Sequence, residues 1–255
     1  MKKTKEFKVP TGRQPFYKPF KRLIMRRIFK QPLVINLAGQ IDKKAIVVSN
    51  HSAKSGPPAL DLYYPVPTCK WGAHEMLEGY KERRKYLRDI LYIKKLHMKP
   101  GFKVSFKASI LAVLNPLVYK GMHMMPTYPD GRLKTTINNS IKVLEAGMSI
   151  MVYPENSNDG YKEVLTEFFP GFVMLGLSYF RRTGEDLPVY PVYYSIPKRI
   201  MVIGKPLYMQ EMVKEGLDRY QIAERYKDAV NQLYFDHVQN AEPYTGKKKK
   251  KSKSK

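Results

Sequence analysis

Short runs rich in β-branched residues alternate with helical patterns along most of this chain, beginning at Lys44. The runs expected to form strands are residues 45–49, 68–72, 122–125, 149–153, 187–196 and 199–203, with 122–125 as an edge strand. Apolar residues follow a helical pattern in residues 102–114, 133–145, 171–182 and 209–239. Strands that alternate with helices are typical of α/β domains with parallel sheets. We therefore predict an α/β fold: a single domain with a mostly parallel mixed sheet flanked by helices.

The positive charge of the chain is concentrated at its two ends. Residues 1–30 carry eleven Lys and Arg against Glu6 alone, and residues 247–255 carry seven Lys, out of a formal net charge of +24. Basic ends hold proteins near polyanions, which are nucleic acids or anionic membranes. We divide the chain into a basic membrane-facing segment (1–30), an α/β domain (31–242) and a Lys-rich disordered tail (243–255), whose alternative role is solubility alone.

The N-terminal segment favours the membrane over nucleic acid. Its apolar residues recur at helical spacing and cations fill the positions between them, which is typical of a helix lying in a membrane interface. The apolar set is Phe16, Phe20, Leu23, Ile24 and Ile28, and the cationic set is Lys21, Arg22, Arg26, Arg27 and Lys30. Pro19 would lie in the first turn, where proline is tolerated. The alternative is that the same apolar stripe packs on the body of the protein.

Several other classes of protein are excluded or disfavoured. The longest nearly uncharged apolar stretch, residues 108–119, is shorter than the roughly 20 residues that span a bilayer, so we predict no transmembrane helix. The N-terminus lacks the apolar region of a secretory signal. Cys69 is the only cysteine, which excludes an intrachain disulfide and a thiolate metal cluster. The 19 tyrosines fall mostly within strand and helix patterns, which argues against a nucleic-acid-binding module.

Two polar stretches follow two of the predicted core strands. SNHSAKSGPPALD, residues 49–61, follows AIVV, and YPENSNDG, residues 153–160, follows SIMV. Ligands of open α/β sheets gather at the carboxyl ends of the strands, so these stretches are the best candidates for a site. The alternative for each stretch is an ordinary surface loop.

The order of sequence blocks resembles the glycerolipid acyltransferase family, whose best-known members are the 1-acylglycerol-3-phosphate acyltransferases. The blocks are a strand ending in SNH, a downstream acid, a strand ending in YPE, a helix opening with PGF, then LPVYPVYYSI and IGKPL. They cover roughly residues 20–210. The resemblance implies a membrane-associated O-acyltransferase that moves a fatty acyl group from a thioester to a glycerolipid or lysophospholipid hydroxyl.

The resemblance also implies the catalytic pair. His51 would be the general base that takes the proton of the acceptor hydroxyl, since the unperturbed pKa of imidazole lies near neutral pH. Asp61 would orient the His51 ring and stabilise the imidazolium. Acyl transfer would then be direct, without an acyl-enzyme.

Substrate-binding residues and partners follow in the same way. Glu155, Asn156 and Ser157 would position the polar head of the acceptor, and Lys54 would supply a cation for its phosphate. No bound cofactor or metal is implied; acyl-CoA or an acyl-carrier protein would be the co-substrate. The expected partners are this acyl donor, a lysophospholipid or glycerol-phosphate-like acceptor and an anionic membrane, with the protein peripheral on its inner, cytoplasmic face.

The chain departs from the family at the first block. The family has four residues between its His and Asp, a spacing that would put the Asp at position 56, where this chain has Gly56. Nine residues separate His51 from Asp61, so we expect the Gly and Pro residues of this stretch to form a loop that bulges out and returns. Glu75 is an alternative partner for the ring.

Two expected arginines are missing as well. Pro126 stands where the family has an Arg, Arg132 is the nearest later cation, and Asn156 and Asn158 replace a Gly and an Arg of the third block. These departures support an alternative function, a catalytically altered or inactive lipid-binding protein on the same fold.

Overall fold

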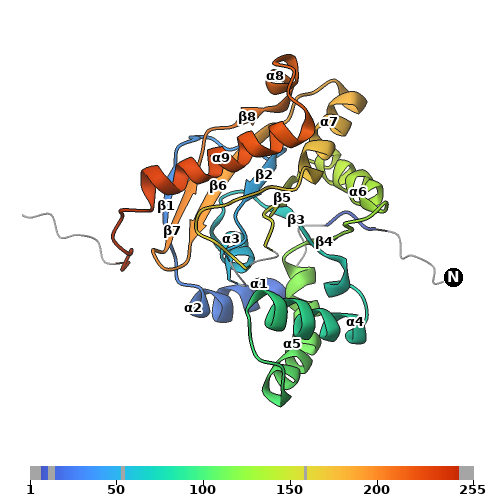
Figure 1. Ribbon diagram of the computed structural model, residues 1–255, viewed down its shortest axis with the longest axis vertical. Helices are drawn as coiled ribbons and strands as arrows, with labels where there is room; N and C mark the ends of the chain where they lie inside the picture. Colours follow the sequence, from blue (N-terminus) through green and yellow to red (C-terminus); the bar gives the residue numbers. More distant parts are fainter. Residues whose placement is uncertain (1–6, 11–14, 53–54, 158–159, 247–255) are drawn as a thin grey trace, which may run out of the picture.

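The computed structural model describes residues 7–10, 15–52, 55–157 and 160–246 and contains an eight-stranded sheet (Figure 1). The strands are β1 Leu33–Asn36, β2 Ile46–Ser49, β3 Thr68–Ala73, β4 Met124–Thr127, β5 Ser149–Val152, β6 Pro188–Ser195, β7 Ile200–Ile203 and β8 Leu207–Tyr208. Their order is β1-β7-β6-β2-β5-β3-β4, and β8 pairs with β6. The pairs of β6 with β7 and β8 are antiparallel and the others are parallel. The predicted α/β fold with a mostly parallel mixed sheet is confirmed, as is β4 at an edge.

Helices and helical turns connect the strands. They are α1 Tyr17–Phe20, η1 Lys21–Met25, α2 Arg26–Ile28, α3 Gly56–Tyr63, η2 His74–Met76, α4 Tyr80–Lys85, η3 Tyr86–Lys95, α5 Phe102–Gly121, α6 Leu133–Glu145, α7 Gly171–Thr183, α8 Met209–Lys214 and α9 Arg219–His237. The first three form one continuous helical segment with a π-helical centre, and α4 continues into the π-helical η3.

Both faces of the sheet are covered, and alternate residues of each strand point to opposite faces. On one face, Ile46 and Val48 of β2 pack in the main core with residues of α6, α7 and α9. On the other, Val47 packs with Ala59 and Leu60 of α3. Burial on both faces explains the continuous apolar runs of the central strands.

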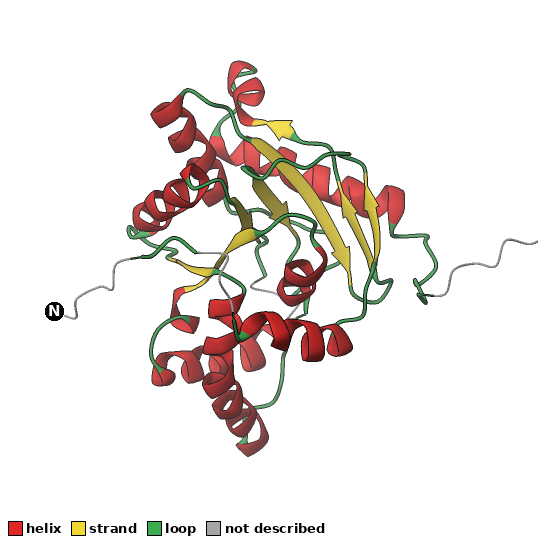
Figure 2. Cartoon of the chain, turned by 180° about the vertical axis from the view of Figure 1, so that it is seen from behind, coloured by secondary structure: helices red, strands yellow, loops and turns green. Residues whose placement is uncertain are grey.

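A second group of helices gathers at one end of the sheet, below the ends of β2 and β5 in Figure 1. This helical cap consists of the N-terminal segment, α4, η3 and α5, and Figure 2 shows the same group from behind. It has its own small core, formed by Met76, Leu87, Tyr92, Val104, Ala108 and Ala112. The cap therefore lies at the carboxyl edge of the parallel strands.

Three local predictions need correction. The helix expected over 209–239 is two helices, because Gly216 adopts a φ of 83° and Asp218 begins α9 with a capping box that includes Gln221. Residues 56–63, expected as a loop, form α3, because Pro57 and Pro58 occupy its first turn, where proline fits. The helix expected over 102–114 extends to Gly121.

The longer α5 also changes the expectation about membrane spans. Among the described residues, α5 is the helix that is long and apolar enough to cross a bilayer, with a mean hydropathy of 1.2 and 17% of its apolar window buried. The apolar stretch is therefore longer than residues 108–119, and the absence of a transmembrane helix stays a prediction. Three of its residues, Val104, Ala108 and Ala112, pack in the core of the cap.

Candidate functional site

The side chain of Asn50 fixes the chain where it leaves β2. Its amide Nδ2 donates to the carbonyl of Tyr194 at 2.9 Å, and its Oδ1 accepts the backbone N–H of Tyr194 at 2.8 Å. The side chain of Asn50 thus extends the pairing of β2 with β6 by two hydrogen bonds to the backbone of Tyr194. Ser52 adds a hydrogen bond from its hydroxyl to the Tyr194 carbonyl at 2.6 Å and adopts a φ of 48°. His51 lies between these two anchored residues, so its backbone is held in one conformation.

The two polar stretches predicted from the sequence meet at the sheet edge. The backbone N–H of His51, after β2, donates to Oε2 of Glu155, after β5, at 2.7 Å. The Glu155 side chain is buried, with 8% of the residue exposed, and the residue also bridges to Phe168. Burial raises the pKa of the Glu155 carboxyl, although the His51 N–H and the charge of Lys95 oppose the shift. A hydrogen bond therefore joins the ends of two neighbouring parallel strands.

Two tyrosine rings contact the imidazole of His51. The Tyr161 ring stacks on it with centroids 5.0 Å apart at 24°, and the Tyr153 ring meets it edge-on at 5.2 Å and 65°. Burial raises the pKa of both phenols, so they stay neutral near pH 7. The imidazole is therefore oriented by aromatic contacts as well as by its anchored backbone.

Lys95 of η3 brings a cation to the same site from the helical cap. Its Nζ donates to the Ser157 hydroxyl at 2.6 Å and lies 5.6 Å from the centroid of the Tyr161 ring. Burial lowers the pKa of Lys95, while the charge of Glu155 opposes the shift. The side chain of Asn156 donates from its Nδ2 to Oε2 of Glu167 at 2.6 Å.

Gly56 explains why the family's spacing is absent. A Cβ atom on Gly56 would lie 2.0 Å from the carbonyl oxygen of His51 and 3.0 Å from the Cβ of Ser52. The N–H of Gly56 donates to the Ser52 carbonyl at 3.2 Å, which closes the tight turn into α3. An aspartate cannot occupy this position without moving the backbone of His51.

Asp61 of α3 is buried among cations. Its Oδ1 lies 2.7 Å from Nζ of Lys70, and its Oδ2 lies 2.9 Å from Nζ of Lys21 and accepts the hydroxyl of Tyr17 at 3.0 Å. The side chains of Asp61 and Lys70 are 9% and 1% exposed. Burial alone would raise the pKa of the Asp61 carboxyl, but the two lysines outweigh it and hold the pKa below its usual value. The pairing of Asp61 with the His51 ring stays a prediction.

Asp61 is nevertheless coupled to the surroundings of His51. Its charge, together with burial, raises the pKa of Tyr153, the tyrosine whose ring meets His51 edge-on. Tyr153 therefore contacts the imidazole and is influenced by the charge of Asp61.

The other predicted residues are distributed differently. Lys54 and Asn158 lie outside the described residues. Glu75 lies beside His74, with Oε2 3.1 Å from Nδ1, and Arg132 pairs with Asp130 at 2.7 Å. No group of three His, Cys, Asp or Glu suited to a metal occurs in the part of the chain that the structure describes.

Sequence reasoning missed Asn50, Lys95, Lys70, Tyr153 and Tyr161. The sequence did point to Asn50 and Tyr153, because both lie in the polar stretches that follow the two core strands. No sequence pattern marked Lys70 and Lys95 as site residues, because lysine in a strand or helix is most often a surface residue. The assembled site can accept a proton at an anchored imidazole near a buried carboxylate and a half-buried cation.

Comparison with known proteins gives a solved structure to which the chain is similar. No protein-family model and no curated protein sequence matches the chain. Among solved structures, the chain is similar to the crystal structure of the 1-acyl-sn-glycerophosphate (LPA) acyltransferase PlsC from Thermotoga maritima. The TM-score is 0.46 and the identity 17%, and the match covers 86% of this chain and 83% of that chain.

Proposed function

We propose that the chain is a membrane-associated O-acyltransferase that moves a fatty acyl group from a thioester to a hydroxyl of a glycerolipid or lysophospholipid. The observation that carries the proposal is the hydrogen bond between the His51 N–H and Glu155, which brings together the two sequence blocks that resemble the glycerolipid acyltransferases. The imidazole of His51 is the proton acceptor of the site.

The reaction needs one base and no protein nucleophile. His51 takes the proton of the acceptor hydroxyl while that oxygen attacks the thioester carbonyl carbon. The tetrahedral intermediate collapses, the carbon–sulfur bond breaks, and the departing thiolate takes the proton back from the imidazolium. Glu155 holds the His51 backbone, while Asn156, Ser157 and Lys54 contact the polar head of the acceptor. Lys95, which donates to Ser157, supplies a cation for negative charge on the substrate.

The outer surface of the helical cap supports attachment to a membrane. Six large apolar side chains of α5 are exposed by 44% to 83%, and they are Phe102, Phe106, Ile110, Val113, Leu114 and Leu117. In the N-terminal segment Phe16, Leu23, Ile24 and Ile28 are exposed by 47% to 80%, so this part of the predicted apolar stripe is not packed on the body of the protein. Large apolar side chains that are exposed along helices in this number are typical of lipid contact.

We propose that α5 lies in the membrane interface rather than across the bilayer. Its residues Val104, Ala108 and Ala112 pack with Leu87 and Tyr92 of η3, so one side of the helix belongs to the cap core. A spanning orientation would remove these contacts. The protein would then be peripheral, on the inner, cytoplasmic face of an anionic membrane.

The alternative function is a lipid-binding protein whose chemistry is altered or lost. The contacts of Asp61 with two lysines and Tyr17 favour it, because they give this carboxylate a structural role that does not require the His51 ring. The absence of two arginines that the glycerolipid acyltransferases have also favours the lipid-binding alternative. The two functions predict the same membrane binding and differ only in acyl transfer.

The test is acyl transfer by the purified full chain with a labelled acyl thioester and a panel of lysolipids. His51→Ala should lower the rate by about 10² to 10⁴-fold with an unchanged melting temperature, because general-base catalysis contributes that much. His237→Ala, at the end of α9, is the matched control and should keep full activity. Full activity of His51→Ala would exclude His51 as the base, and the absence of transfer by wild-type protein would favour the lipid-binding alternative.

A further inference from the structure

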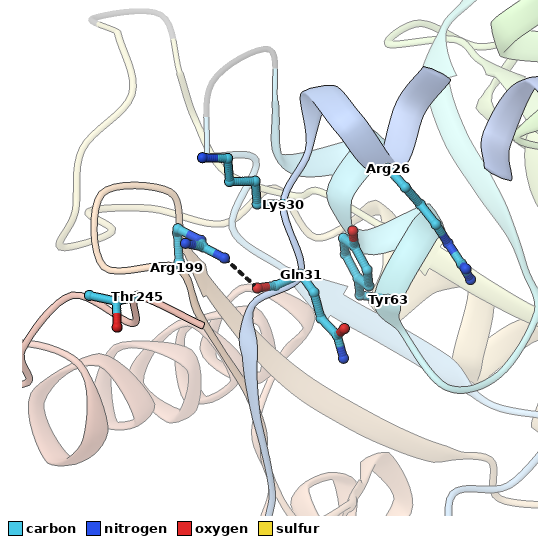
Figure 3. A pocket seen from close by; sticks show the side chains of 6 residues that line it. All are labelled: Arg26, Lys30, Gln31, Tyr63, Arg199 and Thr245. Carbon is cyan, nitrogen blue, oxygen red and sulfur yellow. Dashed lines mark hydrogen bonds between the residues drawn. The ribbon is translucent and has the colours of Figure 1, made fainter. Parts of the chain in front are cut away.

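A cavity of about 450 Å³ lies near the N-terminal segment, away from the residues assigned above (Figure 3). It is lined by Arg26, Lys30, Gln31, Tyr63, Arg199 and Thr245. Of these described lining residues, three are cations and none is a carboxylate, so the cavity has a local positive charge without an internal counter-ion. A cavity with this lining is suited to an anion that carries several negative charges.

Arg199 is the best-fixed cation of the cavity. Its Nη2 donates to the carbonyl of Gln31 at 2.8 Å, and its backbone has a φ of 53°. Its Nε is buried and has no hydrogen-bond partner among the described residues. A buried donor without a partner is costly unless a ligand or water satisfies it. The guanidinium therefore has donor capacity left for a ligand.

Tyr63 provides an aromatic wall between two cations. Its hydroxyl donates to the carbonyl of Phe29 at 2.6 Å, which fixes the ring. Burial raises the pKa of this phenol, and the charges of Arg26 and Arg199 both oppose the shift. Both guanidinium charges thus act on the same phenol, and both belong to the lining of the cavity.

The cavity lies at the same edge of the sheet as His51. Arg199 precedes β7 and Gln31 precedes β1, and these strand starts lie beside the end of β6, which is paired with β2. β7 is two strands from β2 and β1 is three strands from it. At the usual spacing between strands, the cavity is on the order of 10 to 14 Å from His51 along the edge.

This separation discriminates between phosphate-bearing ligands. A glycerol with a phosphate on the carbon next to its hydroxyl is too short to place the hydroxyl at His51 and the phosphate in the cavity. A pantetheine arm, which separates a thioester from the phosphates of its nucleotide, is long enough. We propose that the cavity binds the phosphate groups of a coenzyme A-type acyl donor while its thioester lies at His51; the inference rests on the proposed acyl transfer.

The test is calorimetric titration of the full chain with coenzyme A and with adenosine 3′,5′-bisphosphate. Both should bind the wild-type protein, and Arg199→Gln should weaken both by at least about tenfold, because charge-assisted hydrogen bonds to phosphate are lost. The double variant Arg26→Gln/Lys30→Gln changes only exposed side chains and should weaken binding to the same extent. It tests the cavity independently if Arg199→Gln fails to fold. Arg219→Gln, at the start of α9 near the opposite edge of the sheet, is the matched control.

The outcomes separate this proposal from the proposed function. His51→Ala should bind coenzyme A with wild-type affinity, so loss of acyl transfer leaves the binding test intact. In the transfer assay, Arg199→Gln should raise the KM for acyl-CoA without changing the KM for the acceptor. Equal coenzyme A affinities in Arg199→Gln and Arg219→Gln would overturn the proposal. Weaker binding of lysophosphatidate vesicles or of a phosphopantetheine-bearing carrier protein, with coenzyme A affinity unchanged, would assign the cavity to those sources instead.

Discussion

The backbone of His51 leaves no space for a side chain at Gly56. A Cβ atom at this position would meet the His51 carbonyl oxygen at 2.0 Å, and only a shift of the backbone could relieve the contact. We expect Gly56→Ala to destabilise the protein by about 1 to 3 kcal/mol or more, as overpacking does, and to lower acyl transfer by displacing His51. Urea unfolding measures the first effect.

Gly131→Ala is the control for this substitution, because nothing lies within 4 Å of its Cβ position. Its free energy of unfolding should change by less than about 0.5 kcal/mol. Gly56→Asp, which restores the spacing of the family, should also destabilise the protein and should not raise activity. A stable and more active Gly56→Asp variant would contradict the described turn between His51 and α3.

Asp61 compensates the buried charge of Lys70, whatever its part in catalysis. Asp61→Asn leaves this lysine, which is 1% exposed, without a full counter-charge. Breaking a buried ion pair on one side typically costs about 3 to 5 kcal/mol. We expect a loss of this order in urea unfolding, and a smaller loss when Lys70→Met is added. Asp130→Asn, which breaks an exposed ion pair, is the control and should leave stability unchanged.

The contribution of Asp61 should also depend on pH. The folded-state pKa of its carboxyl lies below the ordinary value of 3.8, so its stabilising effect is present above that pH and is lost as the pH falls through the lower folded-state pKa. The difference in unfolding free energy between wild type and Asp61→Asn should therefore shrink below pH 3.8. A difference that stays constant would mean that the carboxylate is not held ionised by its lysines.

Helix α5 presents its most exposed phenylalanines at its first turns. Phe102 and Phe106 are 83% and 56% exposed and stack on each other at 6.0 Å. Each buried phenylalanine contributes about 1.5 kcal/mol or more to transfer out of water, so Phe102→Ser/Phe106→Ser should weaken vesicle binding by roughly a hundredfold or more in co-sedimentation. Phe235→Ser, on α9, should bind as wild type does; equal losses in both variants would argue against α5 as the contact.

Helices and strands with a regular apolar pattern could be predicted from the sequence. Elements whose bounds depend on local turns and caps could not. Residues 133–145 were predicted with the observed bounds, because apolar spacing and Gly147 mark both the face and the end of the helix. The two prolines of α3 were interpreted as loop residues, although the first turn of a helix accepts them. The break before α9 had a local signal, Asp218 followed three residues later by Gln221, which was overlooked.

The charge of the whole chain makes its membrane binding dependent on salt. Cations flank the apolar surface of the cap and the formal net charge is +24, so vesicles with anionic lipid should bind more tightly than zwitterionic ones. Added salt should reduce the difference, because screening acts on exposed charges. Flotation assays at two salt concentrations measure this. Oligonucleotides that compete fully with the vesicles at moderate salt would contradict the membrane assignment.

The position of the candidate site could be predicted from the sequence, but the contacts between its side chains could not. Parallel strands end at a common edge, so the approach of His51 to Glu155 followed from the order of the elements. The partners of Asp61 come from two parts of the chain, namely Tyr17 and Lys21 of the N-terminal segment and Lys70 of β3. No spacing in the sequence indicates such contacts, because they join separate elements that come together only in the folded chain.

The contacts of Asp61 with Tyr17 and Lys21 tie the N-terminal segment to α3, and the Tyr17 ring also lies against Gly121 at the end of α5. These contacts hold the N-terminal segment and α5 against the α/β domain. Under the proposed attachment to a membrane through these two helices, the orientation of the protein and the height of the His51 imidazole above the lipid would be fixed. We therefore expect an acceptor hydroxyl to reach His51 only where its depth in the bilayer matches that height.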